Sequence, residues 1–368
     1  MTATVAAPET PAARRPGGAP LSSALGSPAN ILVTVIVAAG VILLLVPVVR
    51  WAIIDATWSG AAAACRAEGS GACWAFVRHK LSFILFGLFP VSERWRAAGA
   101  TGVLVALIGF SAHPRFWTRA LLALWVVGLG VAFWLMGGGL GLSPVAARLW
   151  GGLPITLMLT TIGLAAGLPL GIALALGRNS GHALLRTASG VLVEVVRGIP
   201  LIAVLYIAAL IVPLALPRGI EVHKLVLAQL GVAVFAAAYL AEAVRSGLQI
   251  TARGQREAAL AIGLSWWKAH RLVILPQALR VVIPSIVSIG VGFFQDTSLV
   301  VIIGIFDLLN TARLAAQDSA WLGFHREAYL FVGALYFIGS ASLSRYGLWL
   351  ERKLSPVTHV IVRRRGMR

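Results

Sequence analysis

Residues 257–276 read EAALAIGLSWWKAHRLVILP and connect two long apolar stretches, 225–248 and 281–305. The connection is too basic and too regularly patterned to be a simple link. Four positive side chains surround it: Arg253, Arg256, Lys268 and Arg271. Because positive charge concentrates in the cytoplasmic loops of membrane proteins, we expect a compact unit on the cytoplasmic side of a membrane.

Two short helices joined by a turn are expected within this connection. Residues 255–262 are rich in Ala and Leu, which favour a helix. Gly263 then gives the backbone the freedom to turn. Ser265 is placed to cap a second short helix that runs through Arg271.

The connection resembles the EAA loop of the permeases of ABC importers. The matching residues are Glu257, Ala258, Ala259, Gly263, Val273, Leu275 and Pro276. The single departure is Val273, where the family pattern has Ile, and it keeps a β-branched apolar side chain. The resemblance implies that the loop docks into a groove of a separate ATPase subunit. An amphipathic loop lying on the bilayer surface is the alternative.

The composition indicates an integral membrane protein, all-α and polytopic. Of the 368 residues, 59% are hydrophobic and 12% charged, and the mean hydropathy is +0.88. Soluble domains carry about 25% charged residues. The net charge of +18 does not indicate nucleic-acid binding, because the basic residues lie in short loops and the tail. It fits the positive-inside rule and contact with anionic membrane lipid.

The sequence predicts no catalytic, metal or cofactor site. No GxxxxGK[ST] loop occurs, so the chain cannot bind ATP in a P-loop. The seven histidines are scattered, and the only two cysteines, Cys65 and Cys73, lack the CxxC spacing of a metal or redox motif. If ATP drives transport, another polypeptide must hydrolyse it.

An N-terminal membrane region, 31–150, follows a tail at 1–30 that is rich in Ala, Pro, Gly and Ser. We expect that tail to be disordered and cytoplasmic. The region contains a polar interval, 50–96, and three expected spans: 31–49, 97–112 and 121–139. The first span is long enough to cross a bilayer, and we interpret it as retained, with a cleaved signal peptide as the alternative.

Residues 151–350 form a second unit that contains the EAA loop, 253–280, and precedes a basic cytoplasmic tail at 351–368. Its five expected spans are 153–176, 199–216, 225–248, 281–305 and 328–350. About eight spans are therefore expected in all. Small residues recur every four positions in the first span of this unit: Gly163, Gly167 and Gly171. This spacing predicts close contact with another helix of this or a partner subunit.

The distribution of positive charge predicts the orientation. With a cytoplasmic N-terminus, the inside segments hold 17 Lys and Arg residues and the outside segments hold 10. Both termini and the EAA loop are therefore expected in the cytoplasm. The same orientation exports the 50–96 loop to an oxidising compartment, where Cys65 and Cys73 are expected to form a disulfide. Two unpaired thiols are the alternative.

Charged residues within the second unit are candidates for the transport pathway, because charges near a bilayer are costly and usually face protein or water. Glu194 and Arg197 lie three residues apart, as do Glu242 and Arg245, so each pair can meet on one helical face. Two interpretations of these pairs remain open: they form structural ion pairs at the cytoplasmic mouth of the transporter, or they contact the substrate directly. Pro200 is expected to bend its helix.

Asp296 is the strongest single candidate for a pathway residue. It lies in an otherwise apolar span, has no basic neighbour in the sequence, and is followed by the hydroxyls of Thr297 and Ser298. The alternative is that Asp296 caps the broken helix that follows.

Four stretches in order resemble the permease of a polar amino-acid importer of the histidine/glutamine type, with a type I five-helix core. They read ExxRGxPLI, YLAExxRxG, the EAA loop and QDTSLVxxIG. The extra N-terminal helices and the CWAF…ERWR region resemble the larger permease of general L-amino-acid importers. The resemblance implies import of polar or broad-range amino acids across the inner membrane of a Gram-negative cell. It also implies three partners: a second permease subunit in a heterodimer, an ATPase dimer and a periplasmic amino-acid-binding protein.

Two other functions remain open. An autonomous secondary transporter of small polar solutes would favour inverted repeats, and no clear repeat is visible in the sequence. A membrane-anchored scaffold would not need charged residues within the five-helix unit. Copurification of an ATPase separates the importer from both.

Overall fold

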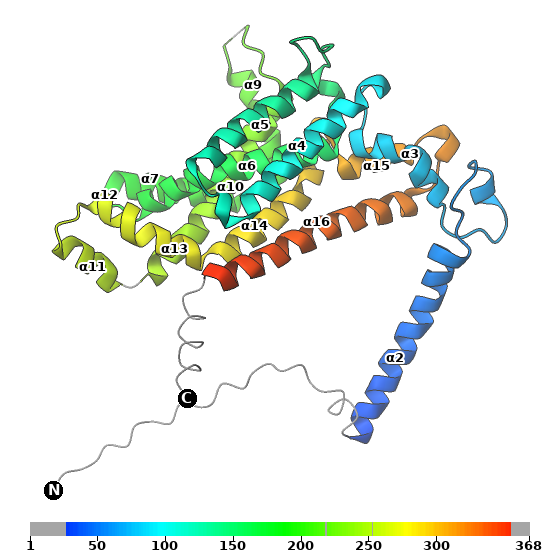
Figure 1. The fold of residues 1–368 in the computed structure, drawn as a ribbon, viewed down its shortest axis with the longest axis horizontal. Coiled ribbons are helices and arrows are strands. Elements are labelled where there is room, and N and C mark those ends of the chain that lie inside the picture. The colour runs from blue at the N-terminus through cyan, green and yellow to red at the C-terminus, as the bar shows by residue number, and fades with distance from the viewer. Residues whose placement is uncertain (1–26, 218, 252, 355–368) are drawn as a thin grey trace. The chain divides into compact units, whose positions relative to one another are not determined.

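The computed structural model describes residues 27–217, 219–251 and 253–354, and in these ranges the chain is almost entirely helical (Figure 1). Seven spans there are long and apolar enough to cross a membrane, and one bent helix pair would make an eighth. The seven are Pro28–Ile54, Val91–Ala112, Arg119–Gly137, Leu153–Arg178, Lys224–Ile250, Ile283–Ile303 and His325–Leu354. The prediction of an all-α protein with about eight spans is confirmed. The predicted tails, 1–30 and 351–368, lie mostly outside the described residues, because 1–26 and 355–368 are not described.

The first of two compact units, residues 1–75, contains a long apolar helix. This helix is α2 Pro28–Val49, continued by the π-helical η1 Arg50–Ile54. It begins before the predicted residue 31 because the side chain of Ser27 accepts a hydrogen bond from the backbone N–H of Asn30 at 3.2 Å. Such a cap satisfies a donor that the first helical turn leaves unpaired.

A disulfide closes the loop that follows this helix. Cys65, in η2 Ala64–Arg66, is bonded to Cys73, and their Cα atoms are 5.4 Å apart. The indole N–H of Trp74 donates to the carbonyl oxygen of Ala52 at 2.7 Å. The two links tie the loop to itself and to the end of the helix, so the alternative of unpaired thiols does not hold in the structure.

The second unit, residues 76–368, opens with a helical hairpin. The elements in order are α3 Trp74–Phe86, η3 Val91–Glu93, α4 Arg94–Ala112, η4 Pro114–Phe116, α5 Arg119–Gly137 and η5 Ala147–Leu149. The fully buried Arg96 side chain on α4 donates to the carbonyl oxygens of Leu135 at 2.7 Å and Ser143 at 2.8 Å. Because a buried guanidinium is costly unless its donors are used, these bonds fix α4 to the end of α5.

The centre of the second unit is the pair α6 Leu153–Arg178 and α10 Lys224–Ile250, which lie side by side (Figure 1). The three small residues of α6 face α10. A Cβ atom at Gly167 would lie 2.7 Å from the Cβ of Ala236, and one at Gly171 would lie 2.9 Å from the carbonyl oxygen of Ala237. The predicted close helix contact is confirmed, and its partner is within the same chain.

The predicted span at 199–216 is helical from Leu201 to Ala215, and the predicted bend at Pro200 joins it to a preceding helix. The structure has α7 Ala183–Gly198, a break, and then α8 Leu201–Tyr206, η6 Ile207–Ile211 and α9 Val212–Ala215. The two helical arms meet at 105°. The break falls at Ile199 and Pro200, because proline has no N–H and restricts the residue before it to extended conformations.

The C-terminal third contains two spans separated by a short strand and helix. In order, the elements are α14 Ile283–Asp296, η8 Thr297–Ile303, β2 Phe306–Asp307, α15 Leu308–Ala315, η9 Ser319–Trp321 and α16 His325–Leu354. β2 pairs in parallel with β1 Gly151–Gly152. The predicted last span, 328–350, is extended at both ends in α16, so the first residues of the predicted basic tail are helical.

Buried polar contacts hold this strand and helix in place. Asp307 is fully buried and caps α15 by accepting from the backbone N–H groups of Leu309 at 3.2 Å and Asn310 at 3.1 Å. The hydroxyl of Tyr336 donates to the same carboxylate at 2.8 Å. Burial raises the pKa of Asp307 above its ordinary value, and these hydrogen bonds oppose that rise.

We predict that Gly167→Ala destabilises the protein by about 1–3 kcal/mol, because the added methyl group over-packs the contact with α10. Gly130→Ala is the matched control, since a Cβ atom at Gly130 has no neighbour within 4 Å. Alanine there should be neutral or slightly stabilising. Thermal unfolding in detergent measures both, and equal melting temperatures would contradict the close-packing interpretation.

Candidate functional site

A cavity of about 520 Å³ lies between the α7–α8 bend, α10 and α14. Its lining is mostly apolar, with three polar side chains that come from three different helices: Arg197, Tyr239 and Asp296. Mostly apolar cavities of this size with a few convergent polar groups are typical of small-molecule sites. Pro200 also lines the cavity, so the bend in the chain helps to form it.

Asp296 and Arg197 bring opposite charges to this cavity without pairing with each other. Asp296 ends α14, and its carboxylate neither caps η8 nor forms an ion pair with any described residue. The guanidinium of Arg197 lies 5.4 Å from the ring centroid of Tyr239, and its Nη1 lies 3.6 Å from a carboxylate oxygen of Glu242. The capping alternative for Asp296 therefore has no support in the structure.

The two hydroxyls that follow Asp296 do not join it. Thr297 is buried, and its hydroxyl donates to the carbonyl oxygen of Phe294 at 2.9 Å. Ser298 is absent from the cavity lining, and its carbonyl oxygen accepts from the side-chain amide of Asn310 at 2.9 Å. The 3₁₀ geometry of η8 turns these residues toward α15 and α16, so the expectation that they share a site with Asp296 does not hold.

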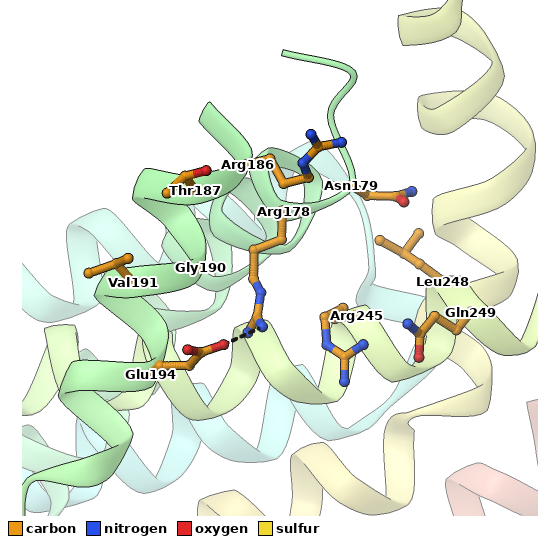
Figure 2. Close-up of a pocket in the computed structure, with 10 residues that line it drawn as sticks. All are labelled: Arg178, Asn179, Arg186, Thr187, Gly190, Val191, Glu194, Arg245, Leu248 and Gln249. Carbon is orange, nitrogen blue, oxygen red and sulfur yellow. Dashed lines mark hydrogen bonds and ion pairs between the residues drawn. The ribbon is translucent and has the colours of Figure 1, made fainter. Parts of the chain in front are cut away.

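The expected pair between Glu194 and Arg197 is also wrong. Glu194 contacts Arg178, at the end of α6, with 3.1 Å between Oε1 and Nη2 (Figure 2). Arg178 also reaches Glu242 at 3.1 Å. The predicted pair Glu242 and Arg245 does form along α10. Because α7 packs against both α6 and α10, its charged side chains reach those helices instead of each other.

Arg178 is the residue that sequence reasoning missed. It is the last residue of a long apolar helix. In the sequence, a positive charge at that position indicates only where a membrane span ends. Its two carboxylate partners, Glu194 and Glu242, lie 16 and 64 residues away. The one available signal was the excess of arginine over glutamate among the charged residues of this unit.

The EAA connection forms the expected helix–turn–helix. α11 Arg253–Ala261 ends before Gly263, whose φ of +83° lies in the left-handed region that favours glycine. The side chain of Ser265 accepts from the backbone N–H of Lys268 at 3.4 Å and caps the next helix. The prediction that this second helix ends at Arg271 is wrong, because the helix continues beyond that residue.

The second helix of this unit continues as α12 Trp266–Ala269, η7 His270–Ile274 and α13 Leu275–Val281. The π turn ends at Ile274, two residues before Pro276, which lacks the N–H that regular α-helical bonding would need. The C-terminal half of the motif therefore lies on one continuous but irregular helix, where the prediction had a short helix that ended at Arg271.

The two halves of the EAA unit have different surroundings. Val273 and Leu275 pack against a buried cluster from α6, α10, η7 and α13: Ala175, Val244, Leu248, Ile274 and Ala278. Glu257 and Ala258 are exposed, and so are the apolar side chains of Ile262 and Trp267. The unit is thus anchored to the bundle at one end and presents a mixed charged and apolar surface at the other.

These features define a membrane-spanning helical transport component, with a charged cavity among its spans and an anchored helical unit at the end of the bundle. The family model for the inner membrane component of binding-protein-dependent transport systems matches residues 167–356. The chain belongs to that family.

Two relatives match most of the chain. The inner membrane amino-acid ABC transporter permease protein YhdY of Escherichia coli (strain K12) is 41% identical over 319 residues, which cover 85% of this chain and 86% of that protein. The glutamate/glutamine/aspartate/asparagine transport system permease protein BztC of Rhodobacter capsulatus is 37% identical, with 78% and 80% covered. A crystal structure of an amino acid ABC transporter with histidines is 27% identical, covers 54% of this chain and 90% of its own, and has a TM-score of 0.48.

Proposed function

We propose that this family member is the permease subunit of an ATP-driven importer that moves amino acids, polar or broad in range, into the cytoplasm. The observation that carries the proposal is the cavity that both Asp296 and Arg197 line. The two relatives described above, from Escherichia coli and Rhodobacter capsulatus, are both named as permeases for amino acids.

The cavity suits an amino-acid zwitterion. Every α-amino acid carries an ammonium and a carboxylate, so a site for the whole class needs one acidic and one basic group. Asp296 has no ion-pair partner among the described residues and is available to the ammonium, while Arg197 presents guanidinium donors to the carboxylate. The cavity volume of about 520 Å³ leaves room for different side chains.

The EAA unit supplies the coupling to ATP hydrolysis. Its exposed end, with Glu257 and the apolar Ile262 and Trp267, would dock onto a separate ATPase subunit. Its anchored end, through Val273 and Leu275, would transmit that movement to α6 and α10. The complex would contain an ATPase dimer, a second permease subunit and a periplasmic amino-acid-binding protein. A secondary transporter would have no use for such an exposed, anchored unit.

In the orientation that we propose from the distribution of Lys and Arg, the EAA unit and both termini lie in the cytoplasm. Residues 31–150 then form an N-terminal membrane region whose loop at 50–96 is exported, and residues 151–350 form the transport core. The disulfide between Cys65 and Cys73 supports this orientation, because such bonds persist in oxidising compartments.

Asp296→Asn keeps the size of the side chain and removes its charge. Losing a charged hydrogen bond to the substrate ammonium costs about 1.5–3 kcal/mol, so amino-acid uptake should fall roughly ten- to hundredfold while the complex still assembles. Ser298→Ala is the control, because Ser298 lies outside the cavity lining. Radiolabelled amino-acid uptake into proteoliposomes measures both, and full uptake by the Asn variant would remove Asp296 from the pathway.

Gly263→Ala should weaken coupling, because a left-handed conformation costs a residue with a Cβ atom about 1–2 kcal/mol. Gly254→Ala, the same change within α11 of the same unit, should be tolerated. Glu257→Lys should act like Gly263→Ala by reversing charge on the docking surface. The measurements are ATPase copurification and substrate-stimulated ATP hydrolysis. Unchanged values for both Gly263→Ala and Glu257→Lys would argue against the coupling role.

Single added cysteines test the orientation. Ser59→Cys lies on the exported loop and Gln255→Cys on α11, and both positions are exposed. A membrane-impermeant maleimide should label Ser59→Cys in intact cells and Gln255→Cys only after the membrane is opened. The reverse pattern would overturn the proposed topology.

A further inference from the structure

A second cavity, of about 420 Å³, lies where the ends of α6 and α10 meet the start of α7, and it shares no lining residue with the cavity around Asp296. Figure 2 shows its lining. Three arginines contribute to that lining, Arg178, Arg186 and Arg245, against one acidic residue, Glu194. Glu242 lies outside the lining but contacts Arg178 and Arg245, so the three arginines keep a surplus of one positive charge over the two carboxylates, which favours an anion.

The arginines keep unused donors. Arg186 forms no ion pair with any described residue. Arg178 uses one nitrogen for Glu194 and one for Glu242, and Arg245 directs Nε and Nη2 to Glu242. Since each guanidinium has five N–H donors, the cluster can still bind an oxyanion after its internal pairs are satisfied.

An exposed apolar face of α7 adjoins the basic cavity. At 100° per residue, the exposed side chains Leu184, Leu185, Val191, Leu192 and Val195 lie on one side of the helix. Val191 belongs to this face, is 55% exposed, and also lines the cavity. The basic wall and the apolar face are therefore continuous.

The cavity lies at the ends of two membrane spans. Arg178 is the last residue of α6, and Arg245 is in the final turns of α10, which ends at Ile250. Ends of spans lie at the level of lipid headgroups. Basic pockets between helices at this level are suited to anionic headgroups.

We propose that this cavity binds an anionic phospholipid. Its phosphate would occupy the space between Arg178, Arg186 and Arg245, and an acyl chain would lie along the exposed apolar face of α7. A soluble phosphate would use the arginines but not that face, and a neutral phospholipid would leave the charge surplus uncompensated. The site is independent of the proposed transport activity.

Native mass spectrometry of the full chain tests the site, comparing retained phosphatidylglycerol with phosphatidylcholine of the same acyl chains. Arg186→Gln should reduce the preference for phosphatidylglycerol roughly fivefold, the effect of one basic residue near an anionic surface. Arg115→Gln is the matched control. Arg115 is an exposed arginine in η4 that does not line the cavity, so its replacement should leave the preference unchanged. A loss that is equal in both variants, or no loss in Arg186→Gln, would overturn the proposal.

Two further measurements identify the occupant. Val191→Gln should weaken phosphatidylglycerol binding if the acyl chain uses the apolar face, and unchanged binding would count against a lipid. Soluble glycerol phosphate should fail to displace phosphatidylglycerol at millimolar concentration; complete displacement would assign the cavity to free phosphate compounds and refute the lipid site. The melting temperature of Arg186→Gln should match that of the unmodified protein, because Arg186 is exposed and forms no ion pair with any described residue.

Discussion

The close approach of α6 and α10 is the constraint on which the transport core depends. It exists because glycine on α6 meets small residues on α10: a Cβ atom at Gly167 would lie 2.7 Å from that of Ala236. In a bilayer the hydrophobic effect does not drive helices together, so packing at this distance must do so. The same approach brings Arg178, at the end of α6, within 3.1 Å of Glu242 on α10.

The charge balance of the core follows from that geometry. The carboxylate of Glu242 contacts the guanidinium groups of Arg178, Arg197 and Arg245. One acid shared by three bases holds them together but cannot neutralise them. The arginines of this cluster line two separate cavities: Arg178 and Arg245 line one, and Arg197 lines the other. Asp296, the acid that would restore part of the balance, has no partner among the described residues and faces the cavity of Arg197.

Backbone irregularities connect this core to the EAA unit. Pro200 separates α7 from α8 at 105° and contributes to the wall of the Asp296 cavity. A π turn before Pro276 lets the helix after Ser265 run on without a break into α13. Val273 and Leu275 on this helix pack against residues of α6 and α10, so the exposed turn at Gly263 belongs to a helical unit that contacts the helix pair.

The sequence by itself determined the spans, the small-residue face of α6 and the helix–turn–helix of the EAA unit, because these depend on local composition, helical period and turn chemistry. Only the tertiary structure decided which charges meet. Glu194 lies three residues from Arg197 yet pairs with Arg178, and Thr297 turns away from the cavity that its neighbour Asp296 faces. Spacing along one helix shows which side chains share a face. The partner of that face depends on how neighbouring helices are rotated and bent, and this is set by packing between residues far apart in the chain.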